Sequence, residues 1–167
     1  FVTAAGSTNS WTNSVGGKWE TAANWSLNVP PFVGQSLVLI TNGGTKFVNI
    51  DAVTAGGFPS TLTISNLTIG APAGATNTLL LDQGGTSTPM RILRGLTVNS
   101  GGAVVINDAA LSIEGTLASA SRIDGALTLN EGSLTVTNGN SQFYIGHSGS
   151  GSLTISNGIF DAYYPIV

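Results

Sequence analysis

A short module recurs through the chain: an apolar residue, Thr or Ser, a second apolar residue, and then Asn, Ser or Gly. Successive side chains of a strand point to opposite sides, so the two apolar residues share one face and the hydroxyl residue lies on the other. The clearest copies begin at Leu62, Leu67, Leu96, Leu111, Leu127, Leu134 and Leu153. Together with looser copies, the pattern predicts about ten short strands, each with one buried and one solvated face.

The segments between modules are rich in Gly and Asn, which tolerate the backbone of tight corners. Two architectures use such a pattern: an antiparallel β-sandwich with hairpins, and a β-solenoid in which the chain winds round one axis. Modules of three residues are short for a sandwich, and only a few turn residues separate them. We therefore predict an all-β fold, a parallel β-helix with three strands per coil, roughly 20 to 28 residues per coil and about four coils over residues 60–160.

The first sixty residues differ from the rest, because they hold all three tryptophans and three of the six prolines. We predict one structural domain in three parts: an arm and Trp-rich cap, or an irregular first coil, over residues 1–60, solenoid repeats over 61–158 and an apolar tail over 159–167. Within the cap, strands are expected at Ser36–Thr41 and Lys46–Asp51. Asn42, Gly43 and Gly44 between them favour a hairpin.

Charge and residue types exclude several function classes. Only 8% of residues are charged, against roughly 25% in ordinary soluble proteins. Five Lys and Arg residues in a chain of net charge −3 provide no basic surface for nucleic acid. The chain has no Cys and one His, so disulfides, thiolate metal sites and multi-His sites are ruled out. No apolar run is long enough for a membrane span, and we expect neither a metal nor a cofactor.

The carboxylates and the one histidine do not form a recognisable catalytic set, which favours a chain that is not an enzyme. Asp108, Glu114, Asp124 and Glu131 lie beside turn residues, where carboxylates usually accept hydrogen bonds from backbone amides; a calcium site is the lesser alternative. His147 lies in a Gly- and Ser-rich turn with no second histidine and no nucleophile elbow. A polysaccharide lyase or hydrolase on this scaffold is the least favoured reading.

Two stretches resemble a known group of proteins. Residues 143–158, Phe-Tyr-Ile-Gly-His-Ser-Gly-Ser-Gly-Ser-Leu-Thr-Ile-Ser-Asn-Gly, resemble the repeat of bacterial autotransporter-associated and PEP-CTERM-associated secreted proteins. The opening from Trp11 through Gly16-Gly17-Lys18-Trp19 to Asn24-Trp25-Ser26 is similar to the Trp-rich start common in such proteins. The resemblance implies a right-handed parallel β-helix on the outside of a bacterium, acting as passenger, adhesin or scaffold, without shared catalytic residues. The chain holds one good copy of the long repeat.

The two ends of a solenoid expose unpaired backbone groups that invite association with another chain. Both termini are apolar, and either could add a strand to a neighbouring subunit as in donor-strand complementation. The alternative, slightly favoured for the tail, is that each terminus packs on its own subunit. The candidate assembly residues are Phe1, Val2, Ile159, Phe160, Tyr163, Tyr164, Ile166 and Val167. Our leading hypothesis is a non-enzymatic extracellular structural protein that associates head to tail with copies of itself into a filament or surface layer.

The alternative is a carbohydrate-binding adhesin module in the same extracellular or cell-surface setting. Its candidate residues are Trp11, Trp19 and Trp25, whose flat rings stack on sugars if they are exposed. A surface polysaccharide is then the partner. The competing interpretation is that the three indoles plug the open end of the hydrophobic solenoid.

Overall fold

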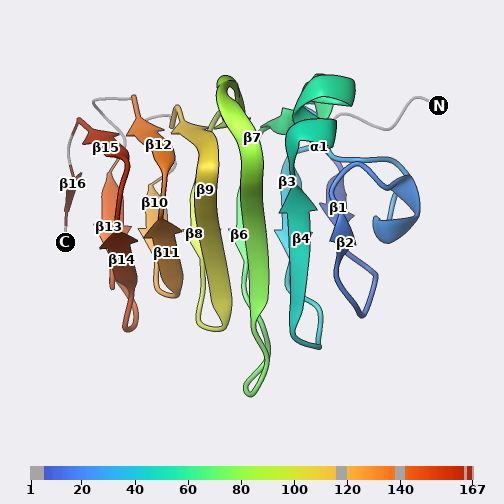
Figure 1. Cartoon of the computed structure of the whole chain (residues 1–167). Helices are drawn as coiled ribbons and strands as arrows, with labels where there is room; N and C mark the ends of the chain where they lie inside the picture. Colours follow the sequence, from blue (N-terminus) through green and yellow to red (C-terminus); the bar gives the residue numbers. More distant parts are fainter. Residues whose placement is uncertain (1–5, 116–119, 138–141, 164, 167) are drawn as a thin grey trace.

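The computed structural model describes residues 6–115, 120–137, 142–163 and 165–166, the last two by their backbone only. About half of the chain is strand, wound into a parallel β-solenoid of about 6 turns with very little helix. Figure 1 shows the coils stacked in chain order along one axis, with the N-terminal coil at one end and the C-terminal coil at the other. The predicted parallel β-helix is confirmed. The sandwich alternative is wrong, because every pairing between the strands of the described part is parallel.

One side of the solenoid, which we call face A, is a seven-stranded sheet with its strands in chain order. Each strand is a short module from one coil. These strands are β1 (Thr8–Ser10), β3 (Leu37–Ile40), β6 (Leu67–Ile69), β8 (Leu96–Val98), β10 (Ser121–Ile123), β13 (Phe143–Ile145) and β16 (Pro165–Ile166).

A second sheet bends to make the other two sides, face B and face C. Face B holds β2 (Gly17–Lys18), β4 (Lys46–Ile50), the first parts of β7 (Asn77–Ile92) and β9 (Gly102–Ile113), β11 (Ala126–Leu129) and β14 (Ser152–Ile155). Face C holds β5 (Thr63–Ile64), the later parts of β7 and β9, β12 (Gly132–Val136) and β15 (Ile159–Ala162). β7 and β9 turn the corner at Gln83 and Asp108, which both have positive φ. Three strands per complete coil agree with the prediction.

The early coils are longer than the late ones. Thr8 pairs with Leu37 and Leu67 with Leu96, a spacing of 29 residues, whereas Arg122 pairs with Tyr144, a spacing of 22. The second coil is lengthened by α1 (Ala52–Gly57) and η2 (Pro59–Leu62), and the first contains η1 (Ala22–Asn24). The predicted coil length therefore fits the later coils and underestimates the earlier ones.

The region predicted as a cap already belongs to the solenoid, because β1 to β4 pair in parallel with the coils that follow. The predicted hairpin between the two strands of this region is wrong. β3 pairs with β1 and β6 on face A, and β4 pairs with β2 and β7 on face B. Asn42, Gly43 and Gly44 therefore form a corner between two faces.

The core consists of ladders of apolar side chains in register. On face B, Leu79, Val104 and Leu127 lie on successive coils and are each 0% exposed. On face C, Ile92 and Ile113 form an equivalent ladder, and both are also 0% exposed. Each such side chain contributes about 1.5–3 kcal/mol by leaving water. The alternate Thr and Ser residues point outward, as the module predicts.

The corner between faces A and B is built differently, with polar and small residues in the inward position. Lys46 pairs with Asn77, and Asn77 with Gly102; Gly125 and Gly151 follow on the next two coils. A Cβ at Gly125 would overlap the carbonyl O of Gly102, so only glycine fits there. The glycine ladder lets the later coils turn this corner tightly.

Candidate assembly surfaces at the two ends of the solenoid

The N-terminal end is closed by the three tryptophans. Trp11, Trp19 and Trp25 are 2%, 0% and 2% exposed. Trp25 meets Trp11 edge to face at a centroid distance of 5.1 Å and Trp19 at 5.0 Å. Each indole N–H donates to a backbone carbonyl: that of Val15 at 3.4 Å, Thr61 at 3.1 Å and Trp19 at 2.7 Å, respectively. The glycan platform predicted at these residues is therefore contradicted, because buried rings offer no face to a sugar.

Trp11 and Trp19 follow the same parallel register as the apolar ladders of the core. The amide of Trp11 donates to Leu39 O and that of Trp19 to Asn49 O, so both indoles continue inward positions of the core. Gly17 makes room for the Asn24 side chain beside Trp11, because a Cβ at Gly17 would lie 2.9 Å from Asn24 Nδ2 and 3.5 Å from the Trp11 ring. The plug is thus a modified first coil.

The backbone edge is also covered where β1 ends, at Ser10. Residues 24–26 run antiparallel along its outer side: Ser26 N donates to Ser10 O at 2.8 Å, and Thr12 N donates to Asn24 O at 2.8 Å. The Ser10 amide donates to Ser26 Oγ at 2.9 Å. The covering segment therefore occupies hydrogen-bonding groups of Ser10 that would otherwise be free to pair with another chain.

A buried amide holds this covering segment in place. Asn9 is 0% exposed and occupies the ladder position of Val38 one coil earlier. Its Nδ2 donates to Val29 O at 2.9 Å, and its Oδ1 accepts from Leu27 N at 3.2 Å. The Asn9 side chain therefore connects the first coil of the core to the segment that covers it by hydrogen bonds.

The C-terminal end lacks such a cover in the described part of the chain. Leu153 and Ile155 of β14 continue the ladder of Leu127 and Leu129, which are each 0% exposed. Leu153 is only partly buried, and Ile155 is 45% exposed. Phe160 of β15 is likewise partly buried and rests on Phe143, with ring centroids 5.8 Å apart. Core positions thus face outward along the axis at this end.

Of the predicted assembly residues, Ile159, Phe160 and Tyr163 are brought together at this end. Ile159 and Tyr163 are 69% and 67% exposed. The backbone of Ile166 pairs with Tyr144 in β13, and its side chain is not described. Phe1, Val2, Tyr164 and Val167 lie outside the described residues.

The predicted roles of the carboxylates are met in part. Asp124 accepts from Ser148 N at 2.7 Å, as expected for a carboxylate beside a turn. Glu114 instead pairs with Arg91, 2.6 Å from its Nε, and this hydrogen bond raises the pKa of Arg91. Asp51, which no sequence motif marks, caps α1 and pairs with Lys18. Among the described residues no group of three or more His, Cys, Asp or Glu is placed to hold a metal ion.

His147 lies on the surface at the end of face A. It packs edge-on against Tyr144 with centroids 4.7 Å apart, and its Nδ1 lies 3.0 Å from Ser148 Oγ. Within the described residues, no helix has the length and apolar character needed to cross a membrane.

No family model, curated protein or solved structure matches this chain. The resemblance to autotransporter-associated repeats therefore stays a prediction from the sequence. The function proposed below rests on the geometry of the two ends.

Proposed function

We propose that this chain is a non-enzymatic structural module, acting outside the cell, that associates with a second copy of itself through its C-terminal coil. The observation that carries the proposal is the contrast between the two ends. At the N-terminal end the core is plugged and the β1 edge is paired, whereas at the C-terminal end Ile155, Ile159 and Tyr163 are exposed. The extracellular setting is supported by the low charge and the abundance of Thr, Asn and Gly.

Charge favours a second copy as the partner. Residues 142–163 hold one carboxylate, Asp161, and no Lys or Arg, so two copies of this end repel each other little. Apolar core positions on one copy are chemically matched to the same positions on the other. A contact between identical surfaces requires a twofold axis.

The closed N-terminal end changes the expected form of the assembly. Head-to-tail growth into a filament needs a free edge at both ends, and at the end of β1 the outer backbone groups of Ser10 already bond to Ser26. Tail-to-tail contact uses the C-terminal end twice and closes on itself as a dimer. The geometry therefore supports a closed pair over the head-to-tail filament expected from the sequence.

Light scattering coupled to size exclusion tests the proposal. We expect the purified chain to be a dimer at high concentration and to dissociate on dilution. The variant Ile155→Lys places a charge in the apolar end and is expected to be monomeric with an unchanged circular dichroism spectrum. Val15→Lys is the matched control, because Val15 is 62% exposed at the opposite end, and this variant should remain dimeric.

A wild-type chain that is monomeric at all concentrations would contradict the proposal. So would an Ile155→Lys variant that dimerises as well as the control. Filaments seen by electron microscopy would restore the head-to-tail alternative.

A further inference from the structure

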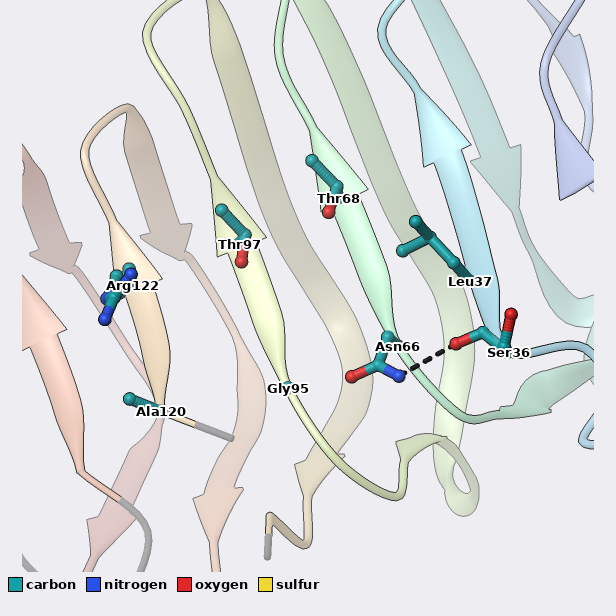
Figure 2. A pocket seen from close by; sticks show the side chains of 8 residues that line it. All are labelled: Ser36, Leu37, Asn66, Thr68, Gly95, Thr97, Ala120 and Arg122. Atoms are coloured by element: carbon teal, nitrogen blue, oxygen red, sulfur yellow. Dashed lines mark hydrogen bonds between the residues drawn. The ribbon is translucent and has the colours of Figure 1, made fainter. Parts of the chain in front are cut away.

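The outer surface of face A is hollowed into a groove of about 430 Å³ (Figure 2). One outward row of side chains shrinks along it from Leu37 and Asn66 to Gly95 and Ala120 on successive coils. The small residues lower the floor of the groove in the middle of the face. Asn66 is held in place, because its Nδ2 donates to Ser36 O at 2.8 Å.

A second outward row forms one wall of the groove. Thr68, Thr97, Arg122 and Tyr144 are in register on four successive coils. Neighbouring strands lie about 4.8 Å apart, so the row presents two hydroxyls, a guanidinium and a phenol at regular steps along the axis. Figure 2 shows the side chains of Thr68, Thr97 and Arg122 aligned on adjacent strands.

The cations of the chain are distributed unevenly with respect to this face. Lys18 pairs with Asp51, Arg91 pairs with Glu114, and the Lys46 ammonium is surrounded by oxygen atoms at the buried corner. The two remaining cations are Arg94 and Arg122. Both are exposed, and neither has an ion pair with a described side chain.

Both of these arginines line the hollowed surface. Arg122 lines the groove, and Arg94 lines an adjoining hollow that shares Ser36 with it. No carboxylate is among the described residues that line either hollow. In a chain of net charge −3, this surface therefore brings together the two Arg side chains that have no ion pair among the described residues, beside hydroxyl and amide groups.

We propose that the face A groove binds a carboxylated polysaccharide, a chain of uronic acid units lying along the solenoid axis. A guanidinium binds a carboxylate through two parallel N–H···O bonds, so Arg94 and Arg122 are suited to the acid groups. Thr68, Thr97 and Asn66 supply donors and acceptors for sugar hydroxyls. A row that repeats at each coil fits a polymer better than a single small anion.

Two cations are too few for nucleic acid, whose binding proteins neutralise many phosphates. The site is separate from the tryptophans, which are buried, and from the C-terminal end that carries the proposed self-association. Its test is therefore independent of that proposal.

Isothermal titration calorimetry with a purified oligogalacturonate tests the inference. The same oligomer with its carboxylates methyl-esterified is the neutral probe of equal length. We expect binding of the acid form that weakens as salt is added and is lost with the ester. Arg122→Gln and Arg94→Gln should each weaken binding about tenfold, as expected for the loss of one charged hydrogen-bonding group.

Arg91→Gln is the matched control, because Arg91 lies on face C and already pairs with Glu114, and it should bind like the wild type. Thr97→Leu fills the groove without changing the charge and should also weaken binding.

Equal binding of acid and ester, no binding of either, or an Arg122→Gln variant as tight as the control would overturn the inference. Stronger binding of a sulfated glycan or of single-stranded DNA than of the uronate would also reject it. Light scattering of Arg122→Gln should show the wild-type oligomeric state, so failure of one proposal is distinguishable from failure of the other.

Discussion

Replacing Lys46 by Met is expected to destabilise the fold far more than the same change at Lys18, the other lysine of the chain. The Lys46 side chain reaches the buried corner between faces A and B, and the residue is 2% exposed. Its Nζ lies within 3.2 Å of five oxygens: Asn42 O and Oδ1, Gly43 O, Gly44 O and Asn77 Oδ1. Burial lowers the pKa of this lysine, but a site with only acceptors favours the ammonium, which has three protons to donate.

The magnitude follows from what the acceptors lose. An ammonium with three protons satisfies at most three of the five contacts fully. Each buried acceptor that is left without a donor costs about 1–3 kcal/mol, so the loss for three acceptors is about 3–9 kcal/mol. Met fills nearly the same volume, so little is added for a cavity. Gly43 and Gly44 are exposed and their carbonyls regain some water, which places the expected loss near the lower limit, about 3 kcal/mol.

Lys18→Met is the matched control for this change. Lys18 pairs with Asp51, but its side chain is 44% exposed, and such surface pairs contribute less than about 1 kcal/mol. Urea unfolding followed by tryptophan fluorescence gives the free energy of unfolding of both variants. The reasoning is refuted if Lys46→Met loses less than Lys18→Met, or if the two variants are equally stable.

Two further substitutions test the closed end and the tight corner. Trp25→Ala removes the ring that contacts the other two indoles of the plug. We expect the free energy of unfolding, measured in urea, to fall by about 3–5 kcal/mol. A loss below about 1 kcal/mol would show that the plug does not stabilise the first coil. Gly125→Ala places a Cβ against Gly102 O, and its midpoint of thermal unfolding should fall, whereas Gly43→Ala, with open space around its Cβ, should leave that midpoint nearly unchanged. Equal midpoints for the two alanine variants would show that the corner has room for a side chain.

The alternating modules were enough to predict the ladders, because a period of two assigns each side chain to a face without knowledge of its partner. The corners were not predictable in the same way. Asn42, Gly43 and Gly44 suit a hairpin and a solenoid corner equally well, and the choice is made by the parallel partners of β3 and β4 about 30 residues away along the chain. Local turn chemistry contains no information about those partners.

The candidate functional surfaces were also predictable only in part. The apolar character of Ile159 and Tyr163 was visible in the sequence, and the structure leaves both exposed at one end. The role of the tryptophans depended on whether residues 24–26 fold back over β1, which composition does not reveal. The face A groove was missed because Thr68, Thr97 and Arg122 are ordinary surface residues until the coil spacing aligns them.

The most direct test of the account is amide hydrogen exchange of the wild-type chain at low and at high protein concentration. Association through the C-terminal coil predicts that the amides of β14 and β15 become protected as the concentration rises. The amides of β1 and of residues 24–26 should exchange at the same rate in both samples, because their edge is already paired within one chain. Protection that rises with concentration at β1, or unchanged exchange at β14 and β15, would contradict the account.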